Sequence, residues 1–206
     1  MEGKLRIVGR LSVIAAFFLC AGCGPRQDGA KGGPAADFRE MMKQAQDGDA
    51  LSAYNVAVSY LTGEGVARNE REGFEWMSRA AYGGEPNAQY NLGVMYALGD
   101  HVPQSVTNAV KWYRLAAEKD IVEAQFNLAL ILYRGQGVRR NRDEAAKWFL
   151  KAAEAGNGRA QYFAGDCRYV GFGGTKDREA AVAWYRKSAA QGVEAAKTRL
   201  KELGVE

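Results

Sequence analysis

The four tryptophans of this 206-residue chain lie 36 residues apart, at Trp76, Trp112, Trp148 and Trp184. Glycines and alanines keep the same spacing, at Gly63, Gly99, Gly135, Gly171 and at Ala81, Ala117, Ala153, Ala189. A period of roughly 20 to 50 residues is typical of an array in which each copy of one supersecondary unit buries its apolar face against its neighbours. The period therefore predicts a solenoid, and it favours a binding surface over an enzyme.

Aligned at this period, the chain divides into four units without insertion or deletion: 49–84, 85–120, 121–156 and 157–192. Large apolar residues recur at i, i+4 in the first half of each unit, which predicts a helix. The second half starts with a residue type preferred at helix N-caps, at Asn69, Ser105, Asn141 and Asp177. Glu72 and Glu144 follow two of these caps by three residues and predict capping boxes. The fold class expected is all-α.

The two ends of the array read as half-repeats. Residues 37–48 align with a second helix and residues 193–203 with a first helix. Their charged outer faces suit the terminal caps that a solenoid needs. Within the array we expect the tryptophans to fill the core between paired helices and not to contact a partner.

Three runs of the repeat carry a family resemblance: Ala-Gln-Tyr-Asn-Leu-Gly from Ala88, Gly-Gln-Gly-Val from Gly135, and Trp-Tyr-Arg-Leu-Ala-Ala-Glu from Trp112. Together they resemble the Sel-1-like repeat, a relative of the tetratricopeptide repeat. The resemblance covers nearly all of residues 37–206. It implies a right-handed α-solenoid of four helix-turn-helix repeats with half-repeat caps, whose concave face binds proteins.

The N-terminus reads as a targeting segment. Basic residues precede the apolar run Leu11–Leu19, and small residues follow, which is typical of a signal peptide over residues 1–22. The ending Cys20-Ala-Gly-Cys23 resembles a bacterial lipobox, so we expect Cys23 to be lipidated. Residues 23–36 are rich in Gly and Pro and are expected to form a flexible tether. Gly24 then favours the outer membrane, with the chain facing the periplasm.

Few chemical groups suggest catalysis. His101 is the single histidine, so neither a metal site of several histidines nor a Ser-His-Asp triad is expected, and no cofactor motif occurs. The net charge is +4, and Arg139, Arg140 and Arg142 form the one dense basic run, which we expect to be a solvated loop. We therefore expect no nucleic-acid binding. Cys167 is expected to pack on a helix.

Candidate contact residues lie on the first helices. Asparagines recur at the period, at Asn55, Asn91 and Asn127, beside an aromatic row that includes Tyr90, Phe126 and Tyr162. The resemblance implies that both rows face the concave groove, where amides can bond a peptide backbone; packing between helices is the alternative. Repeat-specific residues are found in the third and fourth units, at Leu130, Tyr133, Arg134, Phe163, Asp166 and Tyr169.

These observations favour a monomeric, non-enzymatic adaptor that is anchored to a membrane and binds a partner protein or peptide. Two alternatives stay open. One is a cell-wall or β-lactam binding or hydrolysing protein, as in similar secreted repeat proteins, although those carry a cysteine pair in each repeat. The other is a purely structural component of the cell envelope.

Overall fold

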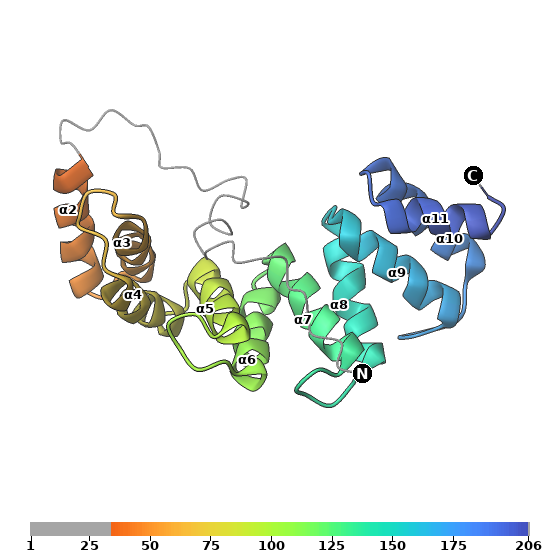
Figure 1. The fold of residues 1–206 in the computed structure, drawn as a ribbon, viewed down its shortest axis with the longest axis horizontal. Helices are drawn as coiled ribbons and strands as arrows, with labels where there is room; N and C mark the ends of the chain where they lie inside the picture. Colours follow the sequence, from red (N-terminus) through yellow and green to blue (C-terminus); the bar gives the residue numbers. More distant parts are fainter. Residues whose placement is uncertain (1–33, 206) are drawn as a thin grey trace. The chain divides into compact units, whose positions relative to one another are not determined.

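The computed structural model of the chain describes residues 34–205, and the regular secondary structure in this range is helical. The chain forms two compact units, one ending at Gln104 and the other starting at Ser105. Unit 1 contains α2 (Pro34–Gln46), α3 (Ala50–Thr62), α4 (Glu70–Tyr82) and α5 (Pro86–Leu98). Unit 2 contains α6 (Val106–Glu118), α7 (Val122–Arg134), α8 (Arg142–Glu154), α9 (Gly158–Val170), α10 (Arg178–Ala190) and α11 (Glu194–Glu202). The second repeat thus gives one helix to each unit (Figure 1).

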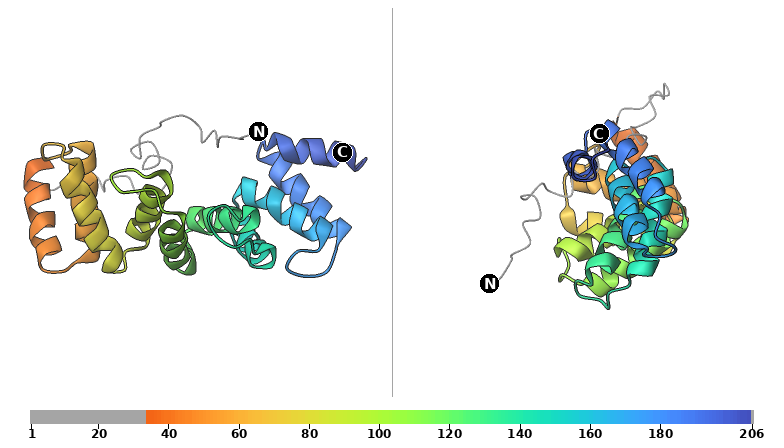
Figure 2. Two further views of the ribbon diagram at one scale, coloured as in Figure 1. Left: turned by 60° about the horizontal axis from the view of Figure 1, so that its bottom comes forward. Right: turned by 90° about the vertical axis from the view of Figure 1, so that its right-hand side faces the viewer.

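Within each unit, helices pack on their neighbours in sequence. In unit 1, α3 contacts both α2 and α4, and α4 contacts α5. In unit 2 the same nearest-neighbour packing runs from α6 to α11, and the alternating helix directions can be followed in Figures 1 and 2. Nearest-neighbour packing of one repeated helix pair is the defining property of a solenoid. The prediction of an all-α repeat solenoid is confirmed.

The predicted N-caps of the second helices are confirmed. The side-chain oxygens of Asn69, Ser105, Asn141 and Asp177 each accept a hydrogen bond from a backbone N–H in the first turn, at 2.9–3.3 Å. The reciprocal hydrogen bond of a capping box, from the N-cap backbone N–H to the side chain of Glu72 or Glu144, is not formed. The backbone N–H of Asn69 donates to Tyr60 O and that of Asn141 to Leu132 O, both at 2.9 Å. These N–H groups are satisfied by the preceding first helix, so they need no glutamate.

Glycine ends all four full-length first helices. Gly63, Gly99, Gly135 and Gly171 have φ between 71° and 97°, the left-handed conformation in which a side chain is strained. In the second repeat the next turn position is His101, which also adopts a positive φ of 61°. Its ring nitrogens lie 3.3 Å from Asp100 Oδ1 and 3.7 Å from Glu70 Oε2.

A row of buried glutamines anchors the first helices to the helices before them. Gln89, Gln125 and Gln161 are 3–5% exposed, and each Nε2 donates at 3.2 Å to the carbonyl of an alanine eight residues earlier. That alanine lies in the last turn of the preceding second helix, where carbonyls lack helical partners. Sequence reasoning missed this row, although the glutamines keep the 36-residue period.

The tryptophans differ in burial, which corrects the expectation that all four fill the core. Trp76 and Trp112 are buried, whereas Trp148 and Trp184 are half-buried. The following residues, Phe149 and Tyr185, are 0% exposed. In α8 and α10 the residue after the tryptophan therefore takes the central core position. The tryptophan lies at the edge of the core, and the ammonium group of the lysine three residues later lies over its ring.

The half-repeats form at both ends of the described range. Phe38 of α2 is 9% exposed and meets Tyr60 of α3 edge-on, with ring centroids 5.4 Å apart. Helix α2 starts at Pro34, within the last residues assigned to the tether. The predicted signal peptide, Cys23 and the rest of the predicted tether lie outside the described residues. None of the helices between residues 34 and 205 is both long and apolar enough to cross a membrane.

Candidate functional site

In unit 1 the predicted contact residues face a mixture of core and solvent. Asn91 of α5 is 5% exposed, and its Nδ2 lies 3.5 Å from the hydroxyl of Tyr54 on α3. Asn55 and Tyr90 are half-buried. The amide of Asn91 therefore links two successive first helices, while Asn55 and Tyr90 keep part of their surface accessible.

In unit 2 the predicted aromatic residues come together in one cluster. Phe163 stacks on Phe149, with ring centroids 4.7 Å apart and planes 8° from parallel. Tyr162, Tyr133 and Phe126 surround Phe163, with centroids 5.3, 5.8 and 6.1 Å away. Offset and edge-on ring pairs of this kind stabilise beyond their buried area. The cluster joins α7, α8 and α9 and leaves Tyr133, Tyr162 and Phe163 half-buried.

Arginines cover the rim of this aromatic cluster. The guanidinium carbon of Arg159 lies 4.6 Å from the centroid of Phe126. That of Arg142 lies 5.3 Å from Tyr133 and 4.9 Å from Phe172. A guanidinium over a ring at this distance is attracted to the negative face of the ring. The accessible edge of the cluster is therefore aromatic and cationic.

A polar group of residues lies between α9, α10 and α11. The hydroxyl of Tyr185 donates to Asp166 Oδ1 at 2.7 Å, and Arg199 Nε lies 3.9 Å from the same oxygen. Burial, followed by the hydrogen bond to Asp166, raises the pKa of Tyr185 well above its usual range. Burial and the charge of Asp166 also raise the pKa of Tyr162. Arg199 in turn lies over the ring of Tyr169, 5.2 Å from its centroid.

The last turns of the first helices carry exposed, repeat-specific side chains. One position of the repeat is Leu98 in α5, Arg134 in α7 and Val170 in α9, and all three are exposed. In unit 2, Asn127 and Leu130 are half-buried on the same helix as Arg134. Arg134 and Val170 thus differ in charge and polarity at equivalent positions of the repeat. A partner that contacts this position would distinguish one repeat from another.

Sequence reasoning missed Arg199, although the period contains it. The asparagine series at Asn55, Asn91 and Asn127 passes through Phe163 and reaches Arg199 after one more step of 36. Extending the series into the terminal half-repeat would have found it. Its contact with Asp166 could not have been found, because Asp166 stands where the third repeat has Leu130 and no pattern pairs the two.

Neither Cys167 nor the acidic residues of the described range belong to a metal site. Cys167 is 3% exposed, and burial raises the pKa of its thiol to about 12, which confirms its assignment as a packed residue on a helix. Within residues 34–205, His, Cys, Asp and Glu form no group of three or more that could hold a metal ion.

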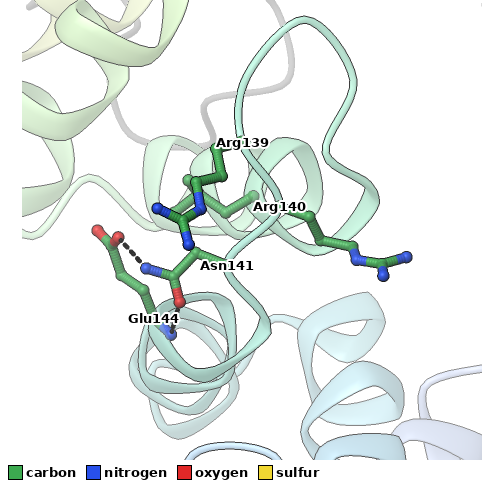
Figure 3. Close-up of a pocket in the computed structure, with 5 residues that line it drawn as sticks. Arg139, Arg140, Asn141 and Glu144 are labelled. Atoms are coloured by element: carbon green, nitrogen blue, oxygen red, sulfur yellow. Dashed lines mark hydrogen bonds between the residues drawn. The ribbon is translucent and has the colours of Figure 1, made fainter.

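An open pocket of about 440 Å³ lies at the loop between α7 and α8. Leu132, Arg139, Arg140, Asn141 and Glu144 line it (Figure 3). Asn141 and Glu144 bond each other through both side chain and backbone, at 3.1 Å in each case. Both Arg139 and Arg140 are exposed.

Comparison with known proteins gives the family. The Sel1 repeat profile matches residues 50–85, 86–121, 122–157 and 158–193. These limits lie one residue after the units predicted from the sequence period. Among curated protein sequences, no match was found.

Two solved structures share the fold. A protective antigen of uropathogenic Escherichia coli with an SLR fold is 34% identical, with a TM-score of 0.71 over 79% of this chain and 35% of that protein. A Sel1 repeat protein from Oxalobacter formigenes is 28% identical, with a TM-score of 0.69 over 84% of this chain and 71% of that one. The chain thus spans about a third of the E. coli antigen. By its four in-phase repeats, this chain belongs to the Sel1 repeat family.

Proposed function

We propose that the chain is a membrane-tethered adaptor that binds a partner protein or peptide on the face formed by its first helices. Sel1 repeats generally act as scaffolds for protein–protein interaction, and that is the coarse function of the family. The finer proposal is that this chain selects its partner through residues of α7 and α9. The anchor would be lipid on Cys23 in the bacterial envelope, at the outer membrane facing the periplasm.

The observation that supports this site is the exposed position shared by Arg134 and Val170. Both side chains end a first helix, both reach solvent, and they differ between repeats of otherwise constant pattern. In the same two helices, Tyr133 and Phe163 are half-buried, so their rings keep accessible surface for a partner to cover. Aromatic rings with an adjacent arginine are the residue types that dominate binding energy at protein interfaces.

A pull-down from envelope extract tests the proposed face. Arg134→Glu and Val170→Glu introduce charge at the first-helix positions, and we expect each to reduce capture of the specific partner by about tenfold, since buried interfacial charge without a counter-ion is costly. Lys147→Glu and Ala183→Glu make matched charge changes at exposed positions of the second helices α8 and α10.

The two pairs of variants separate the alternatives. Capture that falls only with Arg134→Glu and Val170→Glu supports the first-helix face. Capture that falls only with Lys147→Glu and Ala183→Glu places the partner on the second helices and contradicts the proposal.

The tether is tested separately from the binding face. Lipidation of Cys23 predicts that the wild-type chain incorporates a labelled fatty acid and fractionates with membranes, and that Cys23→Ser abolishes both. A Cys23→Ser variant that still incorporates the label would contradict the anchor without affecting the binding face.

A further inference from the structure

We propose that the loop between α7 and α8 is a second binding surface, which takes an acidic peptide segment through Arg139 and Arg140. The sequence alone suggests a solvated basic loop there. In the structure Arg139 and Arg140 are exposed, as expected, and in addition the loop borders a pocket and its two arginines have no partner among the described residues. Binding at this loop does not depend on binding at the first-helix face.

Comparison with the other repeats singles out Arg140. At the equivalent position, Arg68 pairs with Glu70, and Gln104 donates to Ala97 O at 2.8 Å. Lys176 lies over the ring of Tyr169, 5.5 Å from its centroid. Each of these side chains is held by its own repeat. Arg140 makes no hydrogen bond, ion pair or ring contact with residues 34–205.

Arg139 adds a charge that the other repeats lack. Its equivalents are Ala67, Pro103 and Thr175. Like Arg140, it has no hydrogen bond, ion pair or ring contact within the described range. The third repeat is therefore the one repeat in which two adjacent cationic side chains enter this loop.

The acidic residues nearby are already engaged. Asp143 Oδ1 accepts a hydrogen bond from the backbone N–H of Gly173 at 2.9 Å. Glu144 is paired with Arg114 of α6 and accepts a hydrogen bond from Asn141 Nδ2. The remaining basic residue, Arg142, points to the rings of Tyr133 and Phe172. The positive charge of Arg139 and Arg140 is thus left uncompensated.

The directions of the two arginines indicate the kind of ligand. In Figure 3, Arg139 lies on the side of Asn141 and Glu144, whereas Arg140 extends away from them. One carboxylate or one phosphate ion cannot bridge two diverging guanidinium groups. The site therefore requires a ligand that carries two or more separated negative charges, each able to meet one arginine in a charge-assisted hydrogen bond.

The lining of the pocket favours a peptide over a nucleic acid. Two unpaired arginines neutralise too few charges to hold a phosphate backbone, whose binding depends on many such contacts. Glu144 adds one negative charge to the same lining, so the pocket suits a short acidic segment better than a long polyanion.

Fluorescence anisotropy with fluorescein-labelled hexaglutamate tests this surface on the full chain at low ionic strength. We expect saturable binding that Arg139→Gln/Arg140→Gln weakens by about tenfold or more, since both charged contacts are lost. The matched control is Lys147→Gln/Lys201→Gln, which removes the same charge from exposed positions of unit 2. We expect the control to bind within about twofold of wild type.

Competition and stability measurements complete the design. Inorganic phosphate and vesicles of anionic lipid should not displace the peptide at matched ionic strength. All variants should have the same melting temperature as the wild type, because the substituted side chains are exposed. Equal weakening by both double variants, or unchanged binding by Arg139→Gln/Arg140→Gln, would overturn the proposal. So would binding of the vesicles, but not of the peptide, through the two arginines. None of these outcomes involves the residues of the first-helix face.

Discussion

Unit 2 contains two junctions between helices that use equivalent positions of the repeat, one apolar and the other polar. Between the third and fourth repeats, Phe149 stacks on Phe163. One period later, the equivalent positions are Tyr185 and Arg199, which meet at Asp166. The first junction is held by apolar contact between rings. The second is held by a hydrogen bond and an ion pair around one half-buried carboxylate.

The difference shows how much chemistry one repeat geometry tolerates. The stacked pair of Phe149 and Phe163 contains no ionisable group, so its contact is insensitive to ionisation. The polar junction depends on the charge of Asp166 and Arg199 and on a protonated Tyr185, and it would be costly if one partner were removed. The terminal helix α11 is therefore attached to α9 and α10 in part by groups whose interaction depends on protonation, whereas the stacking of α9 on α8 does not.

The largest expected effect is at the apolar junction. Phe149→Ala should lower the free energy of unfolding by about 3–5 kcal/mol, because a fully buried ring is replaced by a cavity. Trp148→Ala serves as the neighbouring control and should cost about half as much or less, since Trp148 is half-buried. Urea unfolding of both variants measures this. A larger loss of unfolding free energy for Trp148→Ala than for Phe149→Ala would show that the tryptophan is the central core residue, contrary to the burial described above.

The polar junction should respond to loss of its carboxylate. Asp166→Leu copies the residue of the third repeat, and we expect a loss of about 2 kcal/mol because the buried hydroxyl of Tyr185 is left without its acceptor. Adding Tyr185→Phe removes the unpaired hydroxyl and should recover part of that loss. Thermal and urea unfolding give the comparison. Strict additivity of the two substitutions would show that the two groups are not coupled.

Close packing at the polar junction predicts a smaller effect at Gly165. A Cβ at this position would lie 2.6 Å from Tyr185 Cε1, whereas the third repeat has Ala129 at the equivalent position. Gly165→Ala should cost about 1 kcal/mol, because overpacking exceeds the gain in helix propensity. The control is Gly174→Ala, whose Cβ meets only the end of the Arg168 side chain, at 3.3 Å. A stabilising Gly165→Ala would mean that Tyr185 has room to move.

The smallest expected effect is a dependence on alkaline pH. The pKa of Tyr185 is raised in the folded state, so the protonated hydroxyl contributes stability that is complete below pH 10 and declines as pH rises through the folded pKa. Tyr185→Phe should flatten this decline relative to wild type in urea unfolding between pH 8 and pH 11. Cys167→Ala controls for the buried thiol, whose pKa is raised from 9.0 to about 12. Equal slopes for wild type and Tyr185→Phe would exclude this role of the hydroxyl.

Much of the fold could be predicted from the sequence because its signals are periodic. The caps at Asn69 and Asp177 and the left-handed glycines recur every 36 residues, so each repeat supports the assignment of the others. What could not be predicted depends on single residues. Phe149 is more buried than Trp148 because of the side of α8 that meets the adjacent first helices. The two residues are neighbours in the sequence, and the sequence does not show which of them lies on that side.

The candidate sites were predictable only in part, for a similar reason. The aromatic cluster of Tyr133 and Phe163 lies where the period is broken, and the sequence pointed there. The contact of Arg199 with Asp166 and the unpaired state of Arg139 arise from side-chain geometry across different helices. Neither has a pattern along the chain. Residues that break the repeat were identifiable, but their partners were not.

Site-specific photo-crosslinking in living cells tests the central claim, that the partner is bound by the first helices of unit 2. A photoreactive phenylalanine analogue at position 170 of α9 is compared with the same analogue at position 183 of α10, since both positions are exposed. We expect a discrete crosslinked partner from position 170 and none from position 183. The same adduct from position 183 alone, or at equal yield from both positions, would contradict it.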